Sequence, residues 1–263
     1  MSITQALILG IVEGLTEFLP ISSTGHLILT QQVLAIEQSA FLATFDIAIQ
    51  VGAICAVIAF YFKSLSNIAL IKKLIIGFIP TGIVGLLVFK YIRTLLENPF
   101  IVVATLFVGG IIILYAEHWY KKKTHEVGIT SHIGYKEAFL LGIFQTLAII
   151  PGVSRSGAMI MGGMFMRLDR TVLTEFTFLL AVPTMVSATA YSMYKHPETI
   201  TQVSNLSPLL VGTVTAFVVA LVVIKVFLNY IRTRSFSVFG YYRIALAIIT
   251  LGFLLSPYVK AFN

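Results

Sequence analysis

Charged residues are scarce in this sequence, and cysteine is nearly absent. Only 11% of the 263 residues are Asp, Glu, Lys or Arg, whereas a soluble domain carries about a quarter. Together with 58% hydrophobic residues and a mean hydropathy of +0.96, this composition excludes a soluble globular domain and predicts an integral membrane protein. The single cysteine, Cys55, excludes an intrachain disulfide, and its apolar neighbours predict a small buried side chain.

Basic residues are also missing from the N-terminal region. No Lys or Arg precedes Lys63, so the positive segment that begins a secretory signal peptide is absent, and we expect no cleavage. A net charge of +7 can indicate a nucleic-acid partner, but the basic residues of membrane proteins collect in cytoplasmic loops. We therefore expect no nucleic acid as a partner, and a solvated loop for the three lysines at 121–123.

Long apolar segments are present in place of charge. Those near the ~20 residues that a transmembrane helix needs are 41–62, 75–91, 99–117, 173–194, 207–228 and 241–259. Two further segments, 3–34 and 136–165, are apolar but interrupted, the first by a proline and SSTG and the second by a proline and GVSRSG. Each of these two segments predicts a helix, a polar loop and a second helix.

The chain also resembles itself at an offset of 132 residues. The matching residues are Ala6, Leu9, Gly10, Ile11, Leu15, Ser22, Gly25 and Ile28 with Ala138, Leu141, Gly142, Ile143, Leu147, Ser154, Gly157 and Ile160, and Glu13 corresponds to Gln145. The sequence therefore predicts one membrane domain, residues 1–263. Its two halves are roughly 1–117 and 134–259, joined by a cytoplasmic loop at 118–133.

The basic residues decide the topology of the two halves. If each interrupted segment enters and leaves on one side, each half has three crossings and the halves are inverted; full crossings would make them parallel. Re-entrant segments place most basic residues on one face, and leave only four on the other, namely Lys90, Arg93, Lys195 and Lys260. The predicted fold is an all-α polytopic membrane protein with an inverted-topology repeat, each half a re-entrant hairpin plus three transmembrane helices. The first hairpin opens outward, and both termini are extracytoplasmic.

Acidic and hydroxyl side chains gather in EGLTEFLPISSTGH, residues 13–26. Glu13 and Glu17 are four apart, so they share one face of a helix. Their two negative charges repel each other in a low dielectric, so a divalent cation, Mg²⁺ or Ca²⁺, is compatible with this pair. The surrounding residues do not form a ligand set that identifies a particular metal. Asp46 and Gln50, at helical spacing in the next span, either bond to this loop or pack between helices.

Hydroxyl groups follow the proline of this segment. Ser22, Ser23 and Thr24 lie where the next helix should begin, and the free N–H groups of a helix N-terminus bind anions. His26, in the same stretch, is a candidate acid, base or nucleophile.

The second interrupted segment has the same design. PGVSRSG, residues 151–157, contains a helix break followed by Ser154 and Ser156, and between them Arg155, whose planar guanidinium suits phosphate. The offset pairs Ser23 with Arg155. We therefore expect the two loops to meet, one bringing carboxylates and the other the cation.

These motifs resemble the two signature regions of the undecaprenyl-diphosphate phosphatase family, also called bacitracin-resistance proteins. The resemblance continues through FDIAIQVGAI, RLDR and EFTFLLAVP, so it covers essentially the whole chain. Met159 stands where the family usually has threonine, so we expect reduced polarity at that position without loss of activity.

The resemblance implies a hydrolase of the cell membrane that converts undecaprenyl diphosphate, a polyprenyl diphosphate lipid, to undecaprenyl phosphate and inorganic phosphate. Such an enzyme recycles the carrier lipid for cell-wall synthesis and confers bacitracin resistance. Carried over residue by residue, the resemblance implies catalytic roles for Glu17, Ser23, His26 and Arg155, and substrate binding by Glu13, Ser22, Thr24, Ser154 and Ser156. Glu13 and Glu17 are the candidate metal ligands.

Several alternatives stay open at this stage. The nucleophile is Ser23, His26 or a water molecule activated by Glu17. A transporter or flippase of anions or polyprenyl lipids is the competing function, because inverted repeats with broken helices also build secondary transporters. The sequence sets no oligomeric state, and a homodimer is compatible with it.

Overall fold

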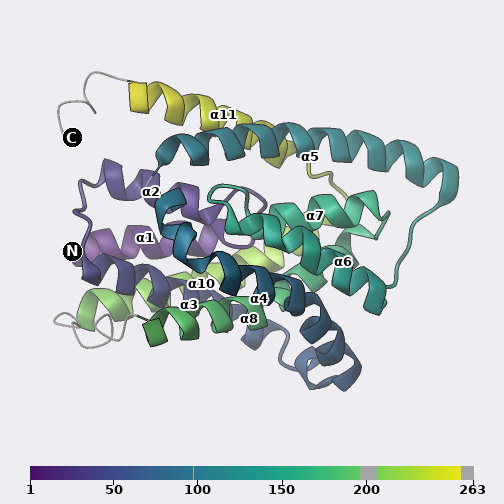
Figure 1. The fold of residues 1–263 in the computed structure, drawn as a ribbon, viewed down its shortest axis with the longest axis horizontal. Coiled ribbons are helices and arrows are strands. Elements are labelled where there is room, and N and C mark those ends of the chain that lie inside the picture. Colours follow the sequence, from purple (N-terminus) through teal and green to yellow (C-terminus); the bar gives the residue numbers. More distant parts are fainter. Residues whose placement is uncertain (97, 196–205, 256–263) are drawn as a thin grey trace.

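The computed structural model describes residues 1–96, 98–195 and 206–255, and these fold into a bundle of helices (Figure 1). Among the described residues the only β pairing is an isolated bridge between Thr130 and Leu168. The helices are α1 (Ile3–Thr16), α2 (Ser23–Val33), α3 (Ala40–Phe60), η1 (Ser64–Ser66), α4 (Ile68–Leu96), α5 (Pro99–Val127), α6 (Tyr135–Thr146), η2 (Leu147–Ile149), α7 (Arg155–Phe165), α8 (Arg170–Lys195), α10 (Leu206–Ile231) and α11 (Ser237–Leu255).

Six of these helices, α3, α4, α5, α8, α10 and α11, are long and apolar enough to cross a membrane. The six predicted spans are therefore confirmed within the described residues, although the helices extend beyond several predicted bounds. Residues 256–259 of the last predicted span lie outside the described residues. The expected loop at 118–133 is helical as far as Val127, because lysines end an apolar window but do not end a helix. Only residues 128–134 then connect α5 to α6.

The exposed surfaces of the transmembrane helices are apolar, as is the packed core. Along α10 the exposed side chains include Val214, Val218, Val222 and Val226, one turn apart on one face. Cys55 on α3 is also exposed, so the prediction that it is buried was wrong. In a membrane protein the lipid-facing side of a helix is as apolar as the packed side, so apolar neighbours do not distinguish the two.

Local backbone conformations recur at the offset seen in the sequence. The described residues include four non-glycine residues with positive φ: Ser22 at 70°, Ala35 at 50°, Ser154 at 72° and Arg167 at 59°. Ser22 corresponds to Ser154, and Ala35 to Arg167. Ser22 and Ala35 flank α2, and Ser154 and Arg167 flank α7, which spans the residues that correspond to α2 at this offset. Rare conformations at matched places support two copies of one structural unit.

Each hairpin packs on a helix of the other half. Helix α1 lies on α10, where a Cβ atom on Gly10 would overlap the carbonyl oxygen of Gly212. Helix α6 lies on α4, where a Cβ atom on Gly142 would overlap the carbonyl oxygen of Gly77. Because these glycines have no side chain, the helix backbones approach closely, and this close packing holds the two halves together.

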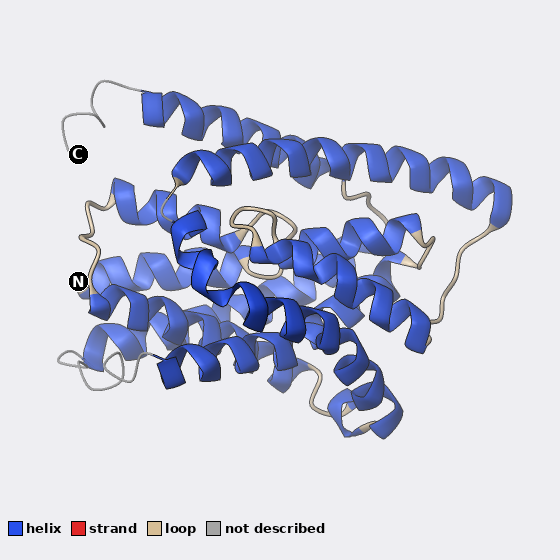
Figure 2. Ribbon diagram, viewed as in Figure 1, coloured by secondary structure: helices blue, strands red, loops and turns tan. Residues whose placement is uncertain are grey.

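The two hairpins, α1–α2 and α6–α7, approach from opposite ends of the molecule, and their connecting loops meet in its middle (Figure 2). The start of α1 and the end of α11 lie at one end, and the connection between α5 and α6 at the other (Figure 1). The orientation of these two ends across the bilayer stays a prediction.

Candidate active site

Both loops end in a serine that caps the following helix. Ser22 Oγ accepts a hydrogen bond from the Gly25 N–H at 3.3 Å, and Ser154 Oγ accepts one from the Gly157 N–H at 3.1 Å. Both serines hold a positive φ, an unfavourable conformation for a residue with a Cβ atom. Such strain persists only where the surrounding structure enforces it, and it concentrates at functional sites.

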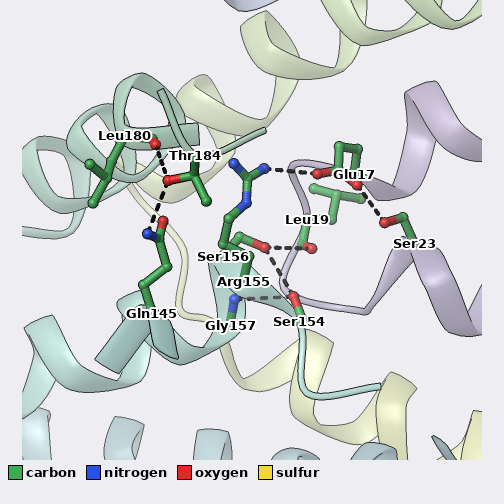
Figure 3. Close-up of polar contacts among 10 residues, drawn as sticks. All are labelled: Glu17, Leu19, Ser23, Gln145, Ser154, Arg155, Ser156, Gly157, Leu180 and Thr184. Carbon is green, nitrogen blue, oxygen red and sulfur yellow. Dashed lines mark hydrogen bonds and ion pairs between the residues drawn. The ribbon is translucent and has the colours of Figure 1, made fainter. Parts of the chain in front are cut away.

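Glu17 joins the two loops at the centre of the site (Figure 3). Its Oε2 accepts a hydrogen bond from Ser23 Oγ at 2.5 Å, and its Oε1 lies 2.8 Å from Arg155 Nη2 in an ion pair. The side chains of Arg155 and Glu17 are only 12% and 8% exposed, so water screens this ion pair weakly. The structure thus brings together a hydroxyl, a carboxylate and a guanidinium from the two hairpins.

The serines of the second loop also tie the loops to each other. Ser156 Oγ donates to the Leu19 carbonyl oxygen at 2.8 Å and lies 3.1 Å from Ser154 Oγ. Next to Leu19, Phe18 is 1% exposed, and its ring meets Phe178 of α8 edge-on at a centroid distance of 5.2 Å. The first loop is therefore held by a hydrogen bond on one side and by the core on the other.

A polar pocket of about 120 Å³ lies between the loops. Its lining collects most of the predicted site residues, namely Glu17, Ser22, Ser23, Thr24, Ser154 and Arg155, and adds Gln50 of α3. Asp46, one turn before Gln50, instead accepts hydrogen bonds from Gln31 Nε2 at 3.0 and 3.1 Å. Met159 is fully buried in α7 and does not line the pocket.

Glu13 does not belong to the lining of this pocket. It is fully buried, and neither of its Oε atoms has a hydrogen-bond partner within the described ranges. Its carboxyl group interacts electrostatically with Glu17, Asp46 and Arg155. A buried carboxylate of this kind requires a proton or a cation, because an uncompensated charge costs several kcal/mol in a low dielectric.

His26 forms its two side-chain hydrogen bonds with residues other than Glu17 and Ser23. Its Nδ1–H donates to the Ser22 carbonyl oxygen at 2.7 Å, so in the neutral ring Nε2 accepts from the Tyr242 hydroxyl, also at 2.7 Å. The two rings are stacked with centroids 5.6 Å apart. Both nitrogens are thus engaged, and His26 does not line the pocket.

Sequence reasoning missed Arg243 on α11. Its side chain is fully buried and donates five hydrogen bonds to backbone carbonyl oxygens, at 2.9 to 3.4 Å. The acceptors are Pro20 of the first loop, Gly152 and Val153 of the second, and Thr105 and Leu106 of α5. An arginine inside the span predicted at 241–259 was itself a signal, because an ionisable residue within a membrane segment has a specific role by default.

An apolar cavity of about 650 Å³ adjoins the polar pocket. It lies between α4, α6 and α8, and its lining shares Ala148 and Arg155 with the polar pocket. Ligand pockets of this size are typically apolar with a few placed polar groups. The arrangement therefore offers a polar end for an anion and an apolar chamber beside it.

The family model described as Bacitracin resistance protein BacA matches residues 6–249. A relative from Sulfurihydrogenibium sp., named undecaprenyl-diphosphatase, is 48% identical over 95% of this chain and 98% of its own length. Relatives with the same name from Persephonella marina and Aquifex aeolicus are 49% and 45% identical, over 97% and 95% of this chain and 100% and 98% of their own lengths. The chain therefore belongs to the bacitracin resistance protein BacA family, and is a multi-pass cell-membrane protein.

Proposed function

We propose that this protein is an undecaprenyl-diphosphate phosphatase: it hydrolyses undecaprenyl diphosphate to undecaprenyl phosphate and inorganic phosphate. The reaction returns the carrier lipid to cell-wall synthesis and confers resistance to bacitracin. The names of relatives that match nearly the whole chain support the substrate. The observation that carries the chemistry is Glu17, which bonds to a hydroxyl with one oxygen and to a guanidinium with the other.

In the proposed reaction Ser23 Oγ attacks the terminal phosphorus while Glu17 takes the hydroxyl proton. The bond from this phosphorus to the bridging oxygen breaks, and Glu17 passes the proton to the departing lipid phosphate. Arg155 and the N–H groups at the starts of α2 and α7 offset the charge on the transferred phosphoryl group. Water, deprotonated by Glu17, then attacks the phosphoserine, and Ser23 recovers its proton.

The contacts of His26 favour Ser23 as nucleophile. A phosphohistidine at Nε2 would have to displace the Tyr242 hydroxyl, and one at Nδ1 the Ser22 carbonyl group. Ser23 needs no such rearrangement, because it lines the pocket and already donates to its base. His26 then acts by holding the Ser22 turn in place. Direct attack by water with Glu17 as base remains the competing route, and trapping a phosphoenzyme distinguishes the two.

A lipid substrate suits the two adjoining pockets. The diphosphate would occupy the polar pocket, and the first isoprenyl units of the chain would lie in the apolar cavity. Arg155 lines both pockets, so it would hold the substrate at the junction of head group and tail. We propose that the lipid enters from the external face, on which the first hairpin opens and both termini lie. A fusion of a periplasm-dependent reporter to the C-terminus tests this orientation.

A divalent cation fits this site in part. The described residues hold no cluster of three or more His, Cys, Asp or Glu side chains able to hold a metal ion, and the oxygens of Glu17 are engaged. Of the two predicted ligands, Glu13 alone has carboxylate oxygens without a hydrogen-bond partner among the described residues, but it does not line the polar pocket. Since Mg²⁺ commonly binds through one or two carboxylates together with substrate phosphates, a Mg²⁺ or Ca²⁺ ion that neutralises charge on the diphosphate would require Glu13 to move toward the pocket.

A transporter or flippase needs a binding site and alternating access, but no hydroxyl placed on a base. The bond between Ser23 and Glu17 therefore favours hydrolysis. A homodimer stays a prediction that the mass of the purified protein in detergent would test.

Phosphate release from a polyprenyl diphosphate by the purified protein in detergent is the direct test. Ser23→Ala and Arg155→Ala should each lose nearly all activity. Thr146→Val is the matched control, because among the described residues this hydroxyl bonds only to the Ile143 carbonyl oxygen of its own helix. The proposal would be refuted if the wild-type protein released no phosphate, or if Ser23→Ala and Arg155→Ala both released phosphate at the wild-type rate.

A further inference from the structure

Gln145, on α6, is the counterpart of Glu13 in the second half, and its amide group has only one consistent orientation. Its Nε2 donates to Thr81 Oγ1 at 2.8 Å and to Thr184 Oγ1 at 3.1 Å. Each threonine hydroxyl gives its single proton to a backbone carbonyl oxygen, Gly142 at 3.1 Å and Leu180 at 2.8 Å. Both hydroxyls can then only accept, so the nitrogen of the Gln145 amide must face them.

The other end of this amide lacks a donor. Gln145 is fully buried, and no described residue bonds to its Oε1. Arg155 Nη1 is likewise buried without a partner among the described residues. Both residues line the apolar cavity, and Nη1 points away from Glu17, toward the side where Thr184 and Gln145 lie (Figure 3). An unsatisfied buried polar atom costs about 1–3 kcal/mol.

The two orphaned atoms have complementary requirements. Arg155 Nη1 needs an acceptor, and Gln145 Oε1 needs a donor. A phosphate monoester with one proton presents both, through P–O⁻ and P–OH. Its second ionisation lies near pH 6, so the protonated form is available close to neutrality. The lipid-side phosphate of a diphosphate is bound to the prenyl chain by an ester and to the terminal phosphate by an anhydride. Its one remaining acidic group is ionised near neutrality, so it offers no P–OH donor.

We propose that Gln145 and Arg155 bind the phosphate of the lipid monophosphate, the organic product, in its singly protonated form. Arg155 Nη1 donates to P–O⁻, the P–OH group donates to Gln145 Oε1, and the isoprenyl chain lies in the apolar cavity. This inference rests on the proposed function, in which the lipid phosphate departs with the proton carried by Glu17. Gln145 thereby distinguishes the product from the intact diphosphate.

Binding of two matched ligands tests the proposal without turnover. The probes are farnesyl monophosphate and its methyl ester, which keeps the tail and one negative charge but has no P–OH group. Isothermal titration of the wild-type protein in detergent should give a dissociation constant about tenfold lower for the monophosphate, the size expected for one hydrogen bond to a charged ligand. Gln145→Met should bind the two alike, and Thr146→Val should keep the wild-type preference.

Binding to the same variants also shows which results would refute the proposal. The proposal is wrong if the wild type binds both ligands equally, or if Gln145→Met keeps the preference. It is also wrong if inorganic phosphate, which carries P–OH without a tail, binds as tightly as farnesyl monophosphate and with the same dependence on Gln145. Should Gln145→Met not fold, the double variant Thr81→Val/Thr184→Val removes both acceptors of the amide nitrogen, leaves the amide free to rotate and should reduce the preference.

Failure of the proposed function has a different signature. In that case the wild type would release no phosphate from a polyprenyl diphosphate, whatever the binding data. With an active enzyme, the inhibition constant of farnesyl monophosphate should rise about tenfold in Gln145→Met, from loss of the same hydrogen bond. An unchanged inhibition constant would contradict product binding at Gln145.

Discussion

Arg155 and Glu17 belong to different hairpins, yet their side chains form an ion pair in which Nη2 and Oε1 are 2.8 Å apart. The ion pair places the Arg155 guanidinium against the Glu17 carboxylate, which also accepts a hydrogen bond from the Ser23 hydroxyl. A substrate phosphate in the pocket would meet both Arg155 and Ser23, so the ion pair orients the cation before substrate arrives.

The geometry of Arg155, beyond its charge, should matter for activity. In Arg155→Lys one ammonium group replaces a fork that contacts Glu17 with Nη2 and leaves Nη1 for a ligand. We expect phosphate release to fall by about 10²-fold, as when one preorganised stabilising group is removed. Initial rates in detergent check this, and wild-type rates in Arg155→Lys would show that charge alone suffices.

Ser23 and His26 should respond differently to substitution. Ser23→Ala removes the proposed nucleophile and should abolish a trapped phosphoenzyme. His26→Asn retains a donor toward the Ser22 carbonyl group, so it should keep more activity than His26→Ala. A radiolabelled diphosphate substrate with rapid acid quench measures the trapped species. Label that persists in Ser23→Ala and disappears in His26→Asn would assign the nucleophile to His26.

Arg243 should be required for both stability and activity. Arg243→Met leaves carbonyl oxygens of both loops and of α5 without their donor, and we expect a loss of about 2–4 kcal/mol of unfolding free energy. Arg243→Lys keeps the charge but not the planar fork, so it should recover little. Thermal unfolding in detergent and phosphate release give the two readouts. An unfolding temperature equal to that of the wild type would contradict this role.

Gly109 provides an independent test of the Arg243 contacts. A Cβ atom at this position would overlap the Arg243 guanidinium group, so Gly109→Ala should displace it from the loops and lower both activity and unfolding temperature. Gly252→Ala, on α11, is the matched control, because a Cβ atom there meets nothing within 4 Å. Equal behaviour of the two alanine variants would show that the arginine tolerates displacement.

The end of the molecule distant from the start of α1 should depend on Glu117. This carboxylate is 1% exposed, pairs with Arg170, and accepts from the Phe236 N–H at 3.2 Å. Glu117→Gln leaves Arg170 partly buried without its counter-charge, and we expect about 3–5 kcal/mol of destabilisation. The catalytic pocket lies elsewhere, so the folded fraction should keep its KM. A changed KM at unchanged stability would refute this structural role.

The sequence by itself determined the membrane class, the six spans and the family, and its self-similarity predicted an internal repeat. These conclusions depend on the length of the apolar segments and on the residues of the sequence motifs, and neither requires knowledge of how the helices pack. The repeat also placed Arg155 opposite the loop of Glu17 and Ser23, and the structure brings all three together.

Only the tertiary structure decided which polar groups face the pocket and which serve other groups. His26 and Ser156 lie in the motifs, yet their hydrogen bonds go to Tyr242, Ser22 and Leu19. Arg243 and Gln145 lie outside the motifs, yet one holds both loops and the other directs an unpaired oxygen to the cavity. These roles depend on which carbonyl and hydroxyl groups become neighbours when helices from distant segments pack, and local sequence spacing does not specify such neighbours.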